Sequence, residues 1–389
     1  MGVSRRAREI PPFIVMDVLE RAQELERAGR SIVHLEVGEP DFDTPQCIKE
    51  AALRALERNQ THYTHSLGLI ELRQAIAGHY RRRYGVEVDP GRVLVTCGTS
   101  PAMLLLFMAL LEPGQEVIVS DPGYACYTNF IQFVGGRAVL VPVREEDGFQ
   151  YRPEEIAARL GPRTKAILIN SPANPTGQLL SPERMAAIAE LAPGTNGPPY
   201  VVSDEIYHGL VYEGREHSIL EFTDNAFVFN GFSKLYAMTG WRLGYLIAPA
   251  RYLRTLQTLQ QSFLISAPHF AQAAALEALK PGRVEQDLER MRAIYDERRR
   301  FMIRRVREIG LKVAVEPTGA FYVFANARRF TSSSYDFAFQ ILEEAGVGVT
   351  PGIDFGANGE GFIRFSYANS LENISTGLDR LERFFQRLE

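Results

Sequence analysis

Cysteine is scarce in this sequence of 389 residues, which contains three of them: Cys47, Cys97 and Cys126. An odd number of widely spaced cysteines makes neither a disulfide framework nor a zinc site. Reduced cysteines are typical of a cytoplasmic protein, and we expect that compartment. His62 and His65 are three residues apart with no third ligand nearby, so we expect no metal site.

Long hydrophobic runs and an excess of positive charge are also missing. The longest apolar run, 103–111, is too short to span a membrane, and the charged residues 1–9 lack the apolar core of a signal peptide. The formal net charge is −4 and the isoelectric point is near 6.1. We therefore expect a globular protein with neither a membrane nor a nucleic acid as its partner.

Lysine is scarce too, since only five of the 43 basic residues are lysines. Lys234 follows the apolar run 226–229, which is typical of a buried strand. An amine near the core can lose its proton and act as a nucleophile that forms a Schiff base. Arg242 can grip a phosphate with paired hydrogen bonds, and Ser233 adds a hydroxyl. The stretch suits an aldehyde that carries a phosphate; the alternative is a lysine and an arginine that simply face solvent.

From residue 92 onward, short apolar strands alternate with helices. We expect strands at 93–96, 116–119, 137–143, 166–169, 200–203, 226–229 and 243–248, with 137–143 and 166–169 buried. Such alternation favours a parallel sheet, which binds ligands beyond the carboxyl ends of its strands. Side chains able to bind a ligand or do chemistry follow directly on five strands: Thr99, Tyr124, Asn174, Asp204 and Lys234. The sequence therefore predicts that these side chains meet at one edge of the sheet.

Two of these strand ends have further features. Gly98-Thr99-Ser100 precedes a helix predicted at 101–111, and a helix N-terminus attracts phosphate through its free N–H groups and its dipole. The turn is neither a P-loop nor a Gly-x-Gly-x-x-Gly motif, so this signal is weak by itself. Asp204 closes an apolar strand, where a carboxylate must be paired; it either meets a ligand or caps the next turn.

The two ends of the chain lack the regular alternation of strands and helices. After residue 268 we expect a compact α+β region with helices at 269–280, 284–308, 337–345 and 371–385, and strands at 312–315, 320–324 and 362–367. Arg364 lies inside the last strand and needs an anion, from a ligand or from an internal salt bridge. Near the N-terminus, a strand at 31–37 leads into Gly38, whose neighbourhood is either a carboxylate-binding turn or a plain Pro/Gly turn. Tyr63 lies in a polar loop before a helix at 70–84.

Several motifs together resemble those of the class I and II aminotransferases, the fold type I enzymes that hold pyridoxal 5′-phosphate (PLP). They are Asn174-Pro175-Thr176-Gly177, Asp204-x-x-Tyr207, Ser233-Lys234 with Gly240-x-Arg242-x-Gly244-Tyr245, and the Gly-x-Pro-x-Phe run from Gly38 to Phe42. They occur in the order and spacing of that family. The resemblance implies an α/β fold: a large domain around a mostly parallel central sheet, 46–280, and a small α+β domain, 281–389, which the N-terminal segment 1–45 joins.

The resemblance also implies roles for single residues. Lys234 is expected to hold PLP as a Schiff base and then to move a proton between the substrate's Cα and the cofactor's C4′. Asp204 is expected to pair with the protonated ring nitrogen, which makes the ring an electron sink. Tyr207 and Asn174 would bond the ring's phenolic oxygen, and Tyr124 would stack on the ring. The remaining expected contacts are Thr99, Ser100, Ser233, Arg242 and the partner subunit's Tyr63 with the phosphate, and Gly38, Asn174 and Arg364 with the substrate's α-carboxylate.

The function that this implies is amino transfer between an L-amino acid and a 2-oxo acid, in a homodimer with shared active sites. Carbon–sulfur β-lyases and aminocyclopropane-carboxylate synthases share the fold and the lysine and stay possible, and a PLP-binding regulatory module is a remoter alternative. Many related aspartate enzymes have a lysine where Ser100 stands, which puts aspartate in doubt as a substrate. Tyr124, Tyr127 and Phe13 would suit an apolar or aromatic side chain.

Overall fold

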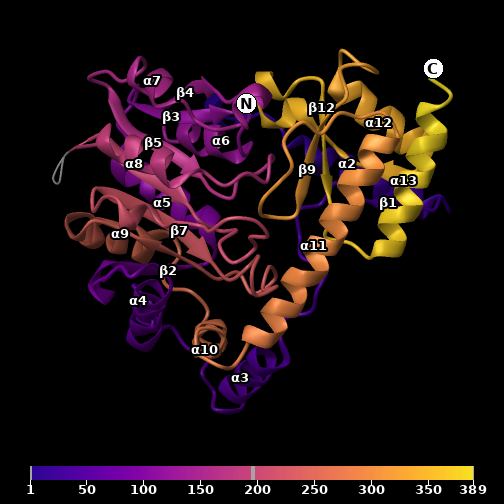
Figure 1. Cartoon of the computed structure of the whole chain (residues 1–389). Coiled ribbons are helices and arrows are strands. Elements are labelled where there is room, and N and C mark those ends of the chain that lie inside the picture. Colours follow the sequence, from indigo (N-terminus) through magenta and orange to yellow (C-terminus); the bar gives the residue numbers. More distant parts are fainter. Residues whose placement is uncertain (1, 194–197, 389) are drawn as a thin grey trace.

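A seven-stranded sheet forms the centre of the larger part of the molecule (Figure 1). The computed structural model describes residues 2–193 and 198–388. The strands lie in the order β2-β8-β7-β6-β5-β3-β4, and β8 alone among them runs antiparallel to its neighbours. Their bounds are β2 Val93–Thr96, β3 Glu116–Asp121, β4 Arg137–Pro142, β5 Thr164–Asn170, β6 Tyr200–Asp204, β7 Ala226–Gly231 and β8 Gly244–Ile247. The predicted α/β fold with a mostly parallel central sheet is confirmed.

Helices cover both faces of this sheet because its strands are apolar on both sides. Along β3, Ile118 packs into one core while Val117 and Val119 pack into the other, as the alternation of side chains along a strand requires. The first core also takes side chains of α3 Gln46–Glu57, α4 Ile70–Tyr84, α7 Pro153–Ala157, α8 Pro182–Glu190 and α10 His269–Ala278. The second takes side chains of α5 Thr99–Leu110, α6 Cys126–Phe133 and α9 Ala250–Phe263.

A second, smaller assembly lies beside the first, with the long helix α11 running along it (Figure 1). Its antiparallel sheet has the order β11-β12-β9. Its elements are α11 Glu285–Glu308, β9 Tyr322–Asn326, α12 Ser334–Ala345, β10 Val347–Gly348, β11 Thr350–Pro351, β12 Phe362–Ser366 and α13 Leu371–Phe385. A separate apolar core fills this region, with contributions from β1 Val33–His34 and from the segment around Tyr207 that follows β6.

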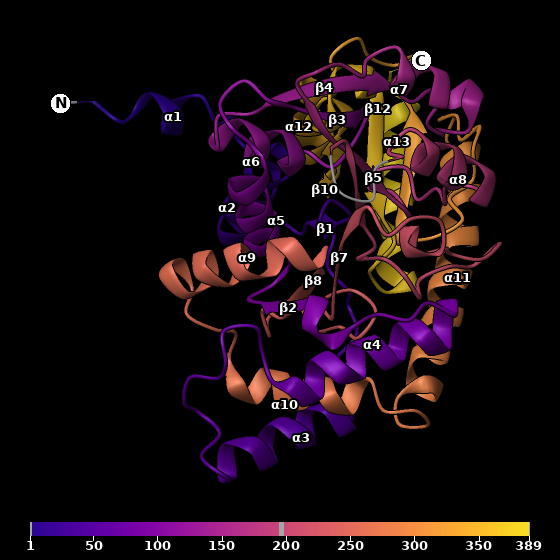
Figure 2. The ribbon, with the colours of Figure 1, turned by 90° about the vertical axis from the view of Figure 1, so that its left-hand side faces the viewer.

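The N-terminal segment packs on the smaller assembly. β1 pairs in parallel with β10, and α2 Ile14–Arg27 buries Val18, Ala22 and Leu25 against Leu342 of α12. α1 Arg5–Arg8 extends away from the body of the molecule (Figure 2). These contacts agree with the expectation that this segment joins the smaller region; the boundaries 1–45, 46–280 and 281–389 stay a prediction.

Several expected elements differ in the structure. The strand expected at 312–315 is a single isolated bridge between Lys312 and Asn326, and the strand expected at 31–37 is reduced to Val33–His34. The strand expected to be buried at 137–143 is β4, an edge strand. Three of its six residues are half-buried and two are exposed, Arg137 and Leu140, the latter by 44%. An edge strand has one free side, which sequence hydrophobicity does not reveal.

Short 3₁₀ helices complete the fold: η1 Pro90–Arg92, η2 Glu145–Asp147, η3 Ile219–Glu221, η4 Gly352–Phe355 and η5 Ala357–Gly359. Within the described parts of the chain, no helix has both the length and the apolar character needed to cross a membrane.

Candidate active site

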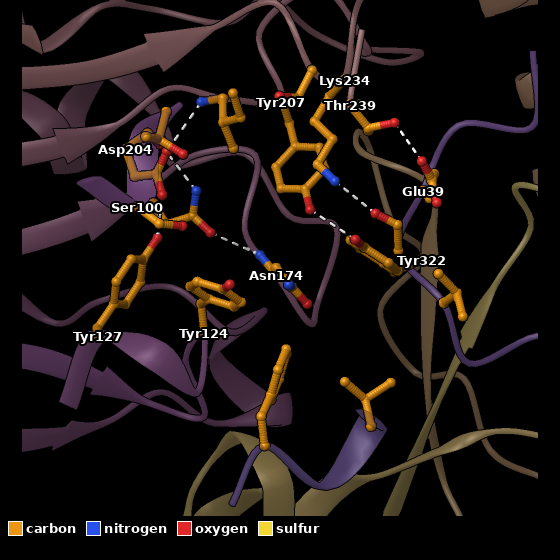
Figure 3. Close-up of a pocket in the computed structure, with 18 of the residues that line it drawn as sticks. Glu39, Ser100, Tyr124, Tyr127, Asn174, Asp204, Tyr207, Lys234, Thr239 and Tyr322 are labelled. Atoms are coloured by element: carbon orange, nitrogen blue, oxygen red, sulfur yellow. Dashed lines mark hydrogen bonds between the residues drawn. The ribbon is translucent and has the colours of Figure 1, made fainter. Parts of the chain in front are cut away.

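A cavity of about 340 Å³ opens where the carboxyl ends of the parallel strands meet the smaller assembly. Every residue predicted for the site lines this cavity except Tyr63. The predicted residues that line it are Gly38, Thr99, Ser100, Tyr124, Asn174, Asp204, Tyr207, Ser233, Lys234, Arg242 and Arg364. The expectation that strand ends scattered along the sequence converge on one edge is confirmed. Figure 3 draws 18 of the lining residues around the open space and labels ten of them.

Lys234 projects into this cavity from the loop that follows β7 (Figure 3). Its Nζ donates a hydrogen bond of 2.6 Å to the carbonyl oxygen of Gly38, a residue far away in the sequence. Burial lowers the pKa of the Lys234 amine to about 8, against the opposing effect of the Glu39 carboxylate, and Arg364 lowers it further. A sizeable share of the amine is therefore neutral near pH 8, as a nucleophile requires.

Asp204 ends β6 and is buried, with 3% of its surface exposed. Its Oδ2 accepts a hydrogen bond of 2.6 Å from the Tyr127 hydroxyl, and its Oδ1 accepts one of 3.2 Å from the backbone N–H of Ile206. Burial raises the pKa of the Asp204 carboxyl to about 6, although these two hydrogen bonds and Lys234 oppose the shift. Because the two hydrogen bonds come from neutral groups, a cation placed in the cavity would be the partner that fully stabilises this carboxylate.

The turn before α5 forms a cradle suited to a phosphate. Gly98 has φ +105°, and a Cβ built on it would lie 2.8 Å from Nη2 of Arg242. A Cβ on Gly244 would lie 2.9 Å from the backbone nitrogen of Thr99. Glycine at both positions therefore lets strand β8 and the Arg242 guanidinium come close to the N-terminus of α5, where free N–H groups attract an anion.

Arg364 lies on β12 with 2% of its surface exposed. Its Nη1 donates to Oδ1 of Asn174 at 2.9 Å, and its Nη2 donates to the Glu36 carbonyl oxygen at 2.5 Å. Its Nε is buried without a hydrogen-bond partner. Among the residues that the structure describes, no carboxylate lies within 4.0 Å of this guanidinium, so the internal salt bridge considered from the sequence is not formed. A buried cation without an anion indicates that a ligand supplies the anion.

Tyr322 of β9 was not predicted for the site. Its hydroxyl and that of Tyr207 are 2.7 Å apart, and the Arg364 guanidinium lies 4.3 Å from the centre of its ring. A Cβ on Gly38 would lie 2.2 Å from the Tyr322 hydroxyl, so Gly38 has to be a glycine for a steric reason. Nothing in the sequence around Tyr322 marked it, because its contacts come from three separate segments, those of Gly38, Tyr207 and Arg364.

Three further residues were missed or given another use. Asn170 accepts the backbone N–H of Asn174 at 2.8 Å and donates to the Asp204 carbonyl at 2.9 Å, which ties two strand ends together. Glu39 accepts a hydrogen bond from the Thr239 hydroxyl on the loop that carries Lys234. Tyr127, predicted to suit an apolar substrate, donates a hydrogen bond from its hydroxyl to Asp204. The position of Asn170 at the end of a strand was a usable signal.

Tyr63 lies outside the cavity and is 80% exposed. Its expected role concerns a neighbouring subunit, which a single chain does not test. In the described parts of the chain, no three histidine, cysteine or acidic side chains form a group that would hold a metal ion. The cavity therefore offers an amine, a carboxylate, an anion cradle and an unpaired guanidinium. These are the groups that PLP and an amino acid need, and the expected cofactor fits.

Comparison with known proteins agrees with this chemistry. A family model described as aminotransferase class I and II matches residues 30–381. The chain is 40% identical over 388 residues to the (5-formylfuran-3-yl)methyl phosphate transaminase of Methanocaldococcus jannaschii, covering 99% of this chain and 100% of that protein. It is also 40% identical over 388 residues to the aspartate/prephenate aminotransferase of Thermus thermophilus, with 99% of each chain covered.

Among solved structures, the aspartate aminotransferase from Thermus thermophilus with maleate matches with a TM-score of 0.94 at 40% identity, covering 98% of this chain and 99% of that one. An aminotransferase from Mycobacterium tuberculosis matches with a TM-score of 0.94 at 38% identity over 100% of both chains. The chain therefore belongs to the class I and II aminotransferases, and it is a transaminase of fold type I whose cofactor is pyridoxal 5′-phosphate.

Proposed function

We propose that this transaminase moves the amino group of an L-amino acid with an uncharged side chain to a 2-oxo acid, with Lys234 as its catalytic residue. The observation that carries the proposal is the placement of Lys234, Asp204 and Arg364 in one cavity. These three groups are what the reaction needs: an amine that carries a proton, an acid for the ring nitrogen, and a cation for the substrate's carboxylate.

When bound, the cofactor supplies a pyridinium ring that withdraws electrons and so makes the substrate's Cα–H bond acidic. Lys234 would hold the cofactor's aldehyde and, once displaced by substrate, would carry the proton away from Cα. Asp204 would keep the ring nitrogen protonated, with Tyr127 holding its carboxylate in place at 2.6 Å. Tyr124 would stack on the ring, and Tyr207 with Asn174 would bond its phenolic oxygen.

The phosphate and the carboxylate would occupy the two ends of the cavity. Thr99, Ser100, Ser233 and Arg242 line the cradle proposed for the phosphate. Arg364, whose Nε has no partner, is proposed to bind the substrate's α-carboxylate together with Gly38 and Asn174. A carboxylate fixed in this way orients the Cα–H bond for cleavage.

The preference for an uncharged side chain rests on how the cations of the cavity are used. Lys234, Arg242 and Arg364 are the cationic side chains of the described residues that line it, and each already has a role. The rest of the lining includes apolar groups, and these are Phe13, Val15, Met16, Val37, Met103 and Ile206. A second carboxylate on the substrate would find no free cation from this chain, so its desolvation would be costly. The relatives' names cover different substrates, so identity alone does not choose between them.

The test is a single-turnover reaction of the PLP-loaded enzyme with candidate amino donors and no acceptor. We expect leucine, phenylalanine or a similar donor to bleach the cofactor's visible band and to release one 2-oxo acid per active site without ammonia. Ammonia released over many turnovers would instead identify a lyase. A preference for aspartate over every uncharged donor would contradict the proposed substrate class.

We further propose that the enzyme is a cytoplasmic homodimer with shared active sites, in which the partner subunit's Tyr63 reaches the phosphate. Exposed apolar side chains on segments around Tyr63 support a partner surface: Leu53, Leu56, Phe263 and Ile265. The three cysteines are free, as expected in a reducing compartment. Sedimentation of the protein in solution measures the oligomeric state directly.

A further inference from the structure

The position of Arg364 depends on a backbone carbonyl in a segment far away in sequence. Its Nη2 donates to the carbonyl oxygen of Glu36 at 2.5 Å and to Oγ1 of Thr350 at 3.0 Å. The Thr350 hydroxyl in turn donates to that same carbonyl at 3.1 Å. The Glu36 carbonyl is therefore a shared acceptor that fixes one side of the guanidinium.

The segment that carries this carbonyl is tied into the smaller assembly. The N–H of Leu35 donates to the Gly348 carbonyl at 3.0 Å, and the Leu35 carbonyl accepts the N–H of Ser366 at 2.7 Å. Ser366 is the last residue of β12, the strand that carries Arg364. Any shift of residues 34–36 would therefore move the acceptor on which Arg364 rests.

The Glu36 side chain is fully buried, although it is a carboxylate. Its Oε1 accepts a hydrogen bond of 2.6 Å from Nδ1 of His34, while its Oε2 has no hydrogen-bond partner. That oxygen lies against Gly348, where a Cβ would come within 2.1 Å of it. His34 and Glu36 are two residues apart on an extended segment, so their side chains point to the same side. Burial of a carboxylate is costly unless a cation pairs with it.

His34 is placed to be that cation. Its Nε2 is 3.2 Å from Oε1 of Glu26 on α2, so the ring lies between two carboxylates. The hydrogen bond with Glu36 raises the pKa of His34 to about 9, against the effect of burial. Because this pKa lies well above 7, the His34 imidazole is protonated at neutral pH. The nearby cation on helix α13, Arg380, donates its hydrogen bonds to the carbonyls of Ser31 and Gly346.

We propose that the His34–Glu36 ion pair is a positioning device for Arg364, which sets the affinity of the enzyme for the substrate's α-carboxylate from outside the cavity. This inference rests on the proposed role of Arg364. Neither His34 nor Glu36 lines the cavity, so the pair acts through the Glu36 carbonyl alone. In the variants of this pair Arg364 still binds and orients the α-carboxylate, only more weakly, so the ground state and the transition state lose the same binding energy; this raises KM and leaves kcat nearly unchanged.

The test compares Glu36→Gln, His34→Asn and Glu26→Gln with the wild type in the PLP-loaded enzyme. Glu36→Gln keeps the shape of the side chain and removes its charge. We expect KM for the amino donor to rise about tenfold, the usual size for loss of a charged hydrogen bond, with kcat within about twofold. The cofactor's visible band and its affinity should not change. Glu26→Gln, which removes only the exposed outer carboxylate, should change KM by less than about twofold at pH 7.5.

The pH dependence separates positioning from general damage to the fold. His34 has a folded-state pKa raised to about 9, so the ion pair is complete below that pH and is lost as pH rises through it. The ratio of the wild-type KM to the His34→Asn KM should therefore approach one above pH 9.5, because the wild type loses the pair that the variant lacks. Titration of the substrate's own amine cancels in this ratio.

Arg364→Ala separates failure of this inference from failure of the proposed function. If that variant leaves KM unchanged, the proposed role of Arg364 is wrong and the inference falls with it. If it raises KM strongly while Glu36→Gln and His34→Asn leave KM and its pH profile as in the wild type, only the inference is wrong. Should Glu36→Gln not fold, the KM and pH profile of His34→Asn decide the question.

Discussion

Single residues in the cavity are held in states that free solvent would not favour. The pKa of the Lys234 amine is lowered and that of the Asp204 carboxyl is raised, in both cases chiefly by burial. Arg364 is buried without an anion. The two pKa shifts and the buried guanidinium have one explanation: each group lacks a partner of opposite charge, which the cofactor or the substrate would supply. Perturbed groups gathered in one cavity are typical of active sites.

Asp204→Asn tests the strongest of these arguments. The variant keeps the shape of the side chain but cannot stabilise a protonated ring nitrogen. Two unit charges about 4 Å apart at an effective dielectric near 20 interact by roughly 4 kcal/mol. We expect kcat to fall by roughly a thousandfold, while the cofactor stays bound through its phosphate. Steady-state kinetics at saturating cofactor measures this, and a loss smaller than about tenfold would contradict the role of Asp204.

The residues of the site that the sequence predicted are those in local motifs or at strand ends, such as Asn174, Asp204 and Lys234. Tyr322 was missed because it belongs to the site only through its contacts with Gly38, Tyr207 and Arg364, which the tertiary fold brings together. The His34–Glu36 pair was missed for the same reason. The buried partner of a half-buried histidine is not visible in a linear pattern.

At the level of elements, two helices were predicted with the bounds that the structure has. The helices predicted at 70–84 and 371–385 match α4 and α13, and in the structure Ser370 is the N-cap of α13. α6 and α9 were not predicted, although they cover one face of the sheet. The expected strand at 312–315 failed because Lys312 finds a single backbone partner, Asn326. Strand length depends on available partners, which periodicity does not encode.

Helix α4 also carries a prediction about acid stability. Burial, with Arg83 and Arg82, lowers the pKa of His79 to about 4. Its folded-state pKa lies below the ordinary value of about 6.5, so its contribution to stability is complete above pH 6.5 and is lost as pH falls toward 4. The ring packs edge-on near Tyr80 and Tyr84, which suits a phenyl ring.

His79→Phe should therefore lessen the loss of unfolding free energy between pH 6.5 and pH 4, by on the order of 3 kcal/mol for a shift of this size. Urea unfolding of the cofactor-free protein at a series of pH values measures the effect. His208, whose pKa burial also lowers to about 4, is present in both proteins, so part of the pH dependence should remain in the variant. An identical pH slope in wild type and variant would show that His79 is not buried in its neutral form.

At the level of the whole molecule, the active site lies between two separately cored assemblies. The large sheet brings Asp204 and Lys234, and the smaller assembly brings Arg364 and Tyr322. The N-terminal segment crosses between them and contributes Gly38 and the Glu36 carbonyl. The order of strand and helix signals predicted this class of fold, while the way the two cores meet depends on side-chain packing that only the structure shows.

The measurement that tests the central claim most directly is the visible spectrum and turnover of Lys234→Ala loaded with PLP. If the amine of Lys234 holds the cofactor and moves the proton, the variant should lack the visible band of the lysine-bound cofactor, and transamination should fall below detection. Lys280→Ala, which changes an exposed lysine paired with Glu277, is the matched control and should behave as the wild type. Normal turnover in Lys234→Ala would contradict the account.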